Sequence, residues 1–290
     1  GTMASTQQKV DEVVAACERY GDRSIIVLSG VAGTSKSHVA WLAAERLTGH
    51  PKFVKEIQFH QGYTYEDFIE GMVPSTSGGF ERKSGVFLAW NDQARKDAEA
   101  AAAERGTPNR YVLLIEELTR ANITAVLGEL MTYIEHRDRY FETPVYATRV
   151  QVHRNLHIIG TMNPRDRSAL EVDEALIRRL RIIEFPPDVT QLREILAGDP
   201  PNPPDITDRL AQMFEVLQQK YPKEFTVLMP FGHALFKGVR NEVDLYHLWE
   251  HQIRHLLHRP LTPEHRLARD ITELYPWKTP PAPTAPPAAG

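Results

Sequence analysis

Residues 25–37 combine the residue types that proteins use to hold a chain of phosphate groups. An apolar stretch over residues 25–28 leads into a glycine-rich turn, which ends in Lys-Ser at the start of a predicted helix. The turn contains Gly30, Val31, Ala32, Gly33, Thr34, Ser35, Lys36 and Ser37. Its backbone N–H groups would surround phosphate oxygens, Lys36 would reach the β- and γ-phosphates, and the Ser37 hydroxyl would hold Mg²⁺. The pattern predicts a site for ATP or GTP with Mg²⁺, and no residue decides between the two bases.

Ser35 stands where this pattern usually has a glycine, directly before the lysine. Glycine is used there because the backbone passes close to the phosphates. Serine is small enough to be tolerated, but the change leaves open a slow or inactive nucleotide site. The alternative for the whole segment is an ordinary connection between a strand and a helix.

Two carboxylates follow another strongly apolar segment. Residues 111–115 read Tyr-Val-Leu-Leu-Ile, and Glu116 and Glu117 come directly after them. Acidic residues at the carboxyl end of a central strand, beside a phosphate-binding turn, are placed to hold Mg²⁺ and to polarise a water. Glu117 is the candidate general base. Glu116, one methylene longer than the usual Asp, is the candidate metal contact beside Ser37, and the alternative is a pair of solvated carboxylates.

The composition is typical of a soluble globular protein, with 290 residues, 42% of them hydrophobic and 25% charged, and a formal net charge of -4. Cys17 is the only cysteine, which excludes internal disulfides and cysteine-rich zinc sites. No apolar run approaches the roughly 18 residues of a membrane span, and no signal peptide is visible, so we expect a cytoplasmic protein with no membrane partner. Residues 276–290 are rich in Pro and Ala, and we expect them to be a disordered tail.

Hydrophobic periodicity divides the first part of the chain into alternating strands and helices. Predicted strands cover residues 25–28, 53–59, 111–115, 156–161 and 181–185. Predicted helices cover residues 6–20, 37–47, 86–104, 121–135 and 172–180. We expect a loop over residues 71–85 and a β-hairpin over residues 140–153. This alternation predicts an α/β fold over residues 1–187, with a doubly wound parallel five-stranded sheet and a β-hairpin insert.

After Pro186-Pro187 the pattern predicts helices only. They cover residues 189–197, 205–220, 231–237, 242–258 and 263–274. We therefore expect a small all-helical domain over residues 188–275. His247, His251 and His255 share one face of a predicted helix, but the outer two would lie about 12 Å apart, too far for a single zinc ion.

Several motifs, in order, resemble the AAA+ motor module of McrB-type proteins, the NTPase subunits of modified-DNA restriction systems. Residues 116–122 read Glu-Glu-Leu-Thr-Arg-Ala-Asn and resemble the family's Asp-Glu-Ile-Asn-Arg-Ala-Asn. Residues 160–168 contain a match to its Met-Asn-x-x-Asp-Arg-Ser signature, and residues 231–236 resemble its Gly-His-Ser-Tyr-Phe element. Segments 58–71 and 83–87 are similar to the family's stretch after the second strand. The resemblance implies an AAA+ P-loop NTPase with a small helical lid domain.

The resemblance also implies roles for individual residues. Asn163 resembles the residue that orients the attacking water, and Asp166 follows it in the signature loop. Arg178 and Arg179 occupy the position that, in AAA+ rings, supplies an arginine finger to the neighbour's nucleotide. His233 resembles a residue of the small domain that lies near the nucleotide.

Structural roles are the alternatives for the same residues. Asp166 could form an ion pair with Arg167 that stabilises the loop. One of the two arginines would pair with an acidic residue, and the sequence does not say which. His233 could be a satisfied core histidine.

The resemblance implies an NTP-hydrolysing motor that forms a homo-oligomer, a hexameric ring. It would drive DNA translocation or remodelling for a McrC-like nuclease, or another co-encoded protein, in antiviral restriction. One alternative is a MoxR-like AAA+ chaperone that remodels proteins. Another is a nucleotide-binding assembly module with weak or no hydrolysis.

Basic side chains that could meet a DNA backbone lie in two segments. Arg149, His153 and Arg154 belong to the predicted hairpin, and Arg82 and Lys83 belong to the predicted loop. Scattered basic residues on loops are usually only solvated, so both interpretations stay open.

Overall fold

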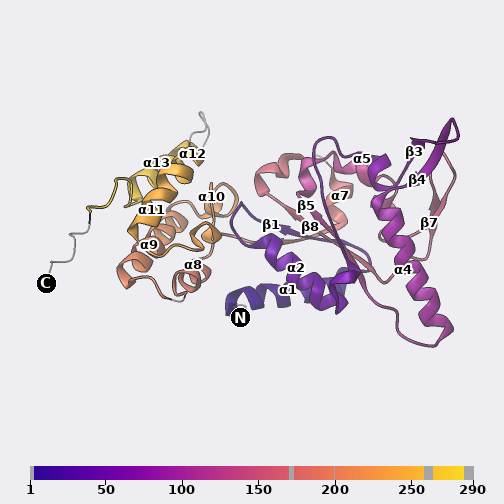
Figure 1. The fold of residues 1–290 in the computed structure, drawn as a ribbon, viewed down its shortest axis with the longest axis horizontal. Helices are drawn as coiled ribbons and strands as arrows, with labels where there is room; N and C mark the ends of the chain where they lie inside the picture. The colour runs from indigo at the N-terminus through magenta and orange to yellow at the C-terminus, as the bar shows by residue number, and fades with distance from the viewer. Residues whose placement is uncertain (1–2, 170–172, 199, 258–263, 284–290) are drawn as a thin grey trace.

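The structure is a computed structural model that describes residues 3–169, 173–198, 200–257 and 264–283. It has two parts, an α/β region over residues 4–185 and a helical region over residues 189–277 (Figure 1). The helical region lies at one end of the molecule, and two β-hairpins lie at the other end.

Five parallel strands form the central sheet, in the order β2-β5-β8-β1-β9, and confirm the predicted α/β fold. They are β1 (Ile25–Ser29), β2 (Val54–Gln58), β5 (Tyr111–Glu116), β8 (Leu156–Met162) and β9 (Leu180–Glu184). The strands β1 and β8 are buried along their whole length, which is why they are unbroken apolar runs in the sequence. Because the strands are parallel, the residues that follow β1, β5 and β8 meet at one edge of the sheet.

Helices cover both faces of this sheet. On one face, α1 (Ala4–Tyr20) and α2 (Lys36–Thr48) pack against it through residues such as Val10, Val39 and Ala43. The other face is covered by α4 (Val86–Ala103), α5 (Ile123–Leu127), α6 (Leu130–Tyr133) and α7 (Glu174–Arg178). Since α2 begins at Lys36, its buried side chains fix the end of the glycine-rich turn against the sheet.

The segment predicted as a loop over residues 71–85 is a second hairpin, so that prediction is wrong. Strands β3 (Glu70–Pro74) and β4 (Phe80–Ser84) pair antiparallel, and Gly78 and Gly79 have φ values of +93° and +74° in the turn between them. The side chains of β4 are mostly exposed, so no apolar pattern marked the strand. The predicted hairpin over residues 140–153 is confirmed as β6 (Tyr140–Glu142) and β7 (Arg149–Gln151).

The helix predicted over residues 121–135 is broken into shorter pieces. They are α5 and α6, and the short 3-10 turn η2 (Leu118–Arg120) precedes the predicted range. Between α5 and α6, Gly128 has a φ of +51°, and a Cβ on it would lie 2.6 Å from the ring of Tyr65. The helix is interrupted because that ring packs against the glycine. Tyr65 opens α3 (Tyr65–Phe68), and η1 (Pro51–Phe53) precedes β2.

The helical region has a core of its own, formed by large side chains such as Phe214, Phe225 and Phe236. Its elements are α8 (Val189–Leu196), α9 (Pro204–Lys220), α10 (Pro222–Val227), η4 (His233–Phe236), α11 (Glu242–Leu248), η5 (Trp249–Ile253), α12 (Arg254–Leu256) and α13 (Glu264–Leu274). The helix predicted over residues 231–237 is only the short 3-10 turn η4, and the one over 242–258 contains a π-helical segment, η5.

The predicted disordered tail begins too early. Trp277 is only 6% exposed, and its ring lies 5.6 Å from that of Tyr275 in the core of the helical region. A large aromatic side chain contributes enough buried apolar area to hold its segment in place despite the surrounding prolines. Residues 284–290 of the predicted tail lie outside the described residues.

A buried carboxylate joins the two hairpins at the far end of the sheet. Glu70 of β3 is 5% exposed and accepts hydrogen bonds from the hydroxyls of Thr143 and Thr148, each at 2.5 Å, and from Arg82. Burial alone would raise the pKa of Glu70, but these hydrogen bonds outweigh it and hold the pKa below its ordinary value. The two hairpins are therefore one connected unit.

Candidate active site

The glycine-rich turn leaves the edge of the sheet where β1 ends. The N–H of Gly30 donates to the carbonyl of Met162 at 3.1 Å, and a Cβ on Gly30 would lie 2.6 Å from the carbonyl oxygen of Phe185. Gly33 has a φ of +82°, in the left-handed region that favours glycine. Gly30 is needed because the backbone of Phe185 lies close to it, and Gly33 is needed because of its left-handed backbone conformation.

Ser35 has φ +66° and ψ +14°, so it also lies in the left-handed region. This conformation explains why glycine is the usual residue before the lysine. A left-handed residue with a Cβ costs about 1–2 kcal/mol. The turn therefore holds a conformation that favours glycine, although the residue at this position carries a side chain.

Lys36 and the start of α2 present positive charge at the turn. The first backbone bond of the helix runs from the N–H of Val39 to the carbonyl of Ser35 at 3.0 Å, so the N–H groups before it have no partner within the helix. The Lys36 ammonium lies 3.4 Å from the carbonyl of Val31. Burial lowers the pKa of Lys36, although the carboxylates of Glu117 and Glu116 act in the opposite direction. The unpaired N–H groups and the Lys36 ammonium are groups that can bind an anion, and the carboxylates of Glu117 and Glu116 lie close enough to act on Lys36.

Glu116 is held between two hydroxyl groups. Its Oε2 accepts hydrogen bonds from Ser37 Oγ at 2.9 Å and from Thr161 Oγ1 at 2.5 Å, and its Oε1 is buried without a partner. An unpartnered carboxylate oxygen beside a serine hydroxyl fits a hard divalent cation such as Mg²⁺, which prefers oxygen ligands. Among the described residues, no group of three or more His, Cys, Asp or Glu could hold a metal ion. Few protein ligands are expected for Mg²⁺, because it usually keeps waters and phosphate oxygens as well.

Glu117 lies next to this pair in an unusual backbone conformation. Its φ is +58°, and its N–H donates to Thr161 Oγ1 at 3.2 Å. Its carboxylate pairs with the Arg120 guanidinium at 2.9 Å. The strained backbone turns Glu117 out of line with β5, so that two successive carboxylates take different directions.

Thr161 is the site residue that the sequence analysis missed. It is 1% exposed, and its hydroxyl contacts both the Glu116 carboxylate and the Glu117 backbone. The sequence feature that could have indicated Thr161 is a hydroxyl in an otherwise apolar predicted strand. Only the pairing of β5 with β8, however, places it beside Glu116.

The signature loop follows β8 as η3 (Pro164–Ala169), and the structure places Asn163 and Asp166 there. The Oδ1 of Asn163 accepts from the N–H of Arg165 at 3.0 Å, and its carbonyl accepts from the N–H of Asp166 at 2.9 Å. Within the described ranges, the side-chain amide nitrogen of Asn163 has no hydrogen-bond partner. The expected partner of Asp166, the Arg167 side chain, lies outside the described residues.

The two candidate finger arginines differ in their surroundings. Arg179 donates to the carbonyl of Ala175 at 2.9 Å, and its Nε lies 3.3 Å from a carboxylate oxygen of Glu135. Arg178 is exposed and has no hydrogen bond or ion pair to any residue that the structure describes. Arg179 is therefore tied to its own subunit, and Arg178 is the one available to another.

His233 comes to the turn from the helical region. It is fully buried, and its Nε2 lies 3.5 Å from the hydroxyl of Ser35. Its Nδ1 accepts from the N–H of Asp188 at 3.0 Å, and burial lowers the pKa of His233 to about 4. A neutral histidine of the helical region therefore lies between the glycine-rich turn and the start of α8.

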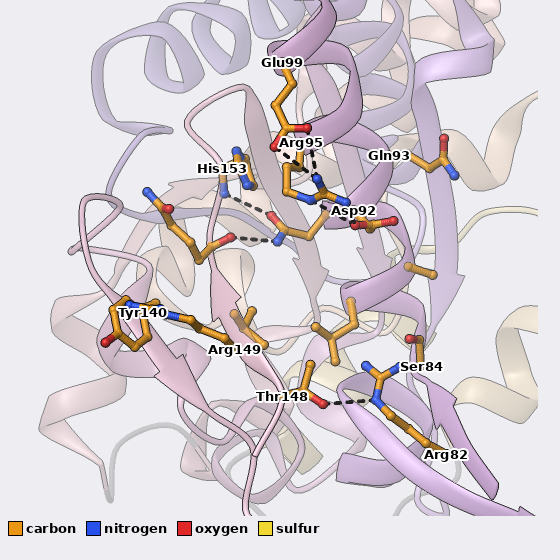
Figure 2. Close-up of a pocket in the computed structure, with 15 residues that line it drawn as sticks. Arg82, Ser84, Asp92, Gln93, Arg95, Glu99, Tyr140, Thr148, Arg149 and His153 are labelled. Carbon is orange, nitrogen blue, oxygen red and sulfur yellow. Dashed lines mark hydrogen bonds and ion pairs between the residues drawn. The ribbon is translucent and has the colours of Figure 1, made fainter. Parts of the chain in front are cut away.

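A separate polar cavity of about 650 Å³ lies between α4 and the β6–β7 hairpin (Figure 2). Its lining includes Arg82, Arg149 and His153, three of the basic residues considered for DNA contact. The guanidinium carbon of Arg149 lies 3.3 Å from the centre of the Tyr140 ring, and no carboxylate pairs with it in the part of the chain that the structure describes. An exposed arginine stacked on an exposed aromatic ring is a surface that can bind an anionic or aromatic group.

The parallel sheet, the phosphate-binding turn and the strand-end carboxylates define a P-loop NTPase. The AAA domain family, dynein-related subfamily, matches residues 25–180, and the chain belongs to this family. No helix in the described ranges is long and apolar enough to cross a bilayer.

Two curated relatives come from restriction systems. The chain is 37% identical over 225 residues to the EcoKMcrB subunit of a type IV methyl-directed restriction enzyme from Escherichia coli K12, covering 73% of this chain and 47% of that protein. It is 24% identical over 188 residues to YdiS, a component of the type II restriction enzyme BsuMI from Bacillus subtilis 168, covering 53% and 54%. The chain thus spans about half the length of the curated relatives it matches. Together with the family match, the first similarity confirms a McrB-type AAA+ module.

One solved structure gives only a partial likeness. A candidate ATPase from Cytophaga hutchinsonii aligns with 67% of this chain and 55% of that chain, at 16% identity and a TM-score of 0.36.

Replacing Thr161 by valine should impair catalysis while leaving the fold intact. Valine keeps the packing volume but removes the hydroxyl that bonds to Glu116 and accepts from Glu117. A hydrogen bond to a charged group contributes about 1.5–3 kcal/mol, which corresponds to a loss of roughly 10–100-fold in nucleotide hydrolysis. Steady-state phosphate release measures it, and Thr161→Ser is the matched control that keeps the hydroxyl. Wild-type turnover in Thr161→Val would contradict this role.

Proposed function

We propose that this chain binds ATP or GTP with Mg²⁺ and hydrolyses it as the motor of a restriction system. The observation that carries the proposal is the Glu116 carboxylate, which is held by Ser37 and Thr161 and has one buried oxygen without a partner. The family match and the similarity to a restriction subunit support it.

In this proposal the N–H groups of residues 30–37 and the Lys36 ammonium bind the phosphates and neutralise their charge. Ser37 and Glu116 would hold the Mg²⁺, which would supply positive charge against the phosphates. Glu117 takes a proton from the attacking water, and Asn163 orients that water through its free amide nitrogen. Asp166 and His233 lie in the loops around the same nucleotide.

We further propose that six copies of this chain form a ring, in which Arg178 acts on the nucleotide of the neighbouring subunit. Its exposure, and the absence of a hydrogen bond or ion pair to the described residues of its own subunit, support Arg178 over Arg179 as the finger. Residues 1–187 would form the nucleotide-binding domain and residues 188–275 a lid domain, in a cytoplasmic protein. The energy of hydrolysis would serve DNA translocation or remodelling for a McrC-like nuclease.

The Lys36→Ala variant should lose hydrolysis, because no other ammonium reaches the phosphates from the turn. Phosphate release is measured with ATP and with GTP, each with and without duplex DNA, at several protein concentrations alongside oligomer mass. We expect turnover in the native chain, stimulated by DNA, and none above background in Lys36→Ala, with the exposed Lys223→Ala as control. Binding and ring formation without phosphate release would make the chain an assembly module. Stimulation by a co-encoded protein but not by DNA would favour the MoxR-like alternative.

Arg178→Ala should reduce turnover by about 1,000-fold, the scale of known arginine fingers, without changing nucleotide affinity much. Mixing Arg178→Ala with Lys36→Ala should restore part of the activity. In a mixed ring, some intact nucleotide sites then face an intact Arg178. Arg179→Ala should instead lower the melting temperature, because it removes the contacts with Glu135 and Ala175. Absence of rescue on mixing would contradict action between subunits.

Arg149→Ala should reduce DNA stimulation but not the basal hydrolysis, if the cavity beside the β6–β7 hairpin meets the DNA backbone. Loss of one phosphate contact should lower the dependence of log K on log salt by about 0.9. Fluorescence anisotropy of labelled DNA at several salt concentrations measures it. The control is Arg240→Ala, an exposed arginine in the helical region. Equal DNA binding by both variants would leave the Arg149–Tyr140 pair as a surface feature.

A further inference from the structure

The helical region touches the phosphate-binding turn through its backbone as well as through His233. The N–H of Ala234 donates to the carbonyl of Gly33 at 2.8 Å. A Cβ on Gly232 would lie 2.3 Å from the Gly33 carbonyl oxygen, which is closer than any real contact. Residues 231–234 therefore press directly against the middle of the turn, and only glycine at position 232 permits this.

Val31 adds a third contact of a different kind. It lies in the turn, yet its side chain is 1% exposed and belongs to the core of the helical region, with residues such as Phe231. The turn is thus anchored to the helical region by an apolar side chain, a backbone hydrogen bond and a close glycine contact.

The position of the proton on the His233 ring decides whether Nε2 donates or accepts a hydrogen bond. Because Nδ1 accepts the N–H of Asp188, the proton of the neutral ring lies on Nε2. Nε2 is therefore a donor; the Ser35 hydroxyl lies 3.5 Å from it, and His233 also forms a hydrogen bond with the backbone of Thr34, so the ring contacts two successive residues of the turn. Asp188 is the N-cap of α8, so the histidine is oriented by the first turn of the helical region.

Ser35 is the residue of the turn that most needs such support. It holds a left-handed conformation at a cost that glycine would not have, and its hydroxyl is the group that His233 reaches. The serine is then more than a tolerated replacement for glycine, because its hydroxyl provides a polar contact between the turn and His233 of the helical region.

We propose that residues 231–234 are a structural part of the phosphate-binding site, in which His233 is a positioning residue that holds Ser35 in its left-handed conformation. The inference rests on the proposed nucleotide site and deepens it. Phosphate binding and the position of the helical region are coupled through Ser35, Gly33 and Val31. A movement of the turn toward a phosphate displaces the helical region directly, without an intervening segment.

The test compares His233→Ala, Ser35→Gly and the double variant. The readouts are hydrogen exchange of the peptide covering residues 30–37 in nucleotide-free protein and the affinity for a non-hydrolysable ATP or GTP analogue. His233→Ala should speed exchange in that peptide and weaken analogue binding about 3–10-fold, the scale of one hydrogen bond. In the Ser35→Gly background the same change should have little further effect, because glycine adopts the left-handed conformation unaided.

Additive effects of the two changes, or unchanged exchange in His233→Ala, would overturn the proposal. If His233→Ala does not fold, the Ser35→Ala variant is used instead, because it keeps the Cβ and removes the hydroxyl. Hydrogen exchange in the peptide covering residues 30–37 that equals exchange in the native chain would overturn the proposal. Exchange in nucleotide-free protein does not require binding or hydrolysis, so failure of the proposed function would be seen separately, as an analogue that does not bind the native chain.

The close glycine contact has its own pair of variants. Gly232→Ala should displace the turn and weaken analogue binding by more than tenfold. The matched control is Gly198→Ala, whose Cβ would meet nothing closer than 3.5 Å. Equal analogue binding by the two alanine variants would show that the turn does not depend on the contact with residue 232.

Discussion

A single carboxylate links the three strand ends on which the site depends. Glu116 follows β5, Thr161 ends β8, and Ser37 belongs to the helix that continues from β1. Parallel pairing brings these ends to one edge of the sheet, and the two hydroxyls fix the carboxylate beside Lys36. The second oxygen of Glu116 is buried without a hydrogen-bond partner, and a bound cation would satisfy it.

The phosphate-binding turn is supported from two sides. The packing of α2 against the sheet fixes its end. The helical region contacts its middle through Gly232 and Ala234 and encloses the side chain of Val31 in its own core. Two residues of the turn, Gly33 and Ser35, have left-handed backbone conformations and are separated by one residue. A backbone of this kind persists when the surrounding structure holds it in place. The same contacts join the turn directly to the helical region.

The opposite end of the molecule is organised differently. Two hairpins are joined there by the buried Glu70, and a polar cavity opens beside the stacked Arg149 and Tyr140. The glycine-rich turn, which contacts the helical region, and this second surface thus lie toward opposite ends of the molecule (Figure 1).

The sequence by itself determined the parallel sheet, the turn over residues 30–37 and the pair Glu116-Glu117, because these depend on local composition and on apolar periodicity. It did not reveal the β3–β4 hairpin, since exposed strands carry no apolar pattern, or the packed Trp277. Only the tertiary structure decided the role of Thr161, the difference between Arg178 and Arg179, and the contact of His233 with Ser35. Each of these joins residues far apart in the chain, and local propensity contains no information about such distances.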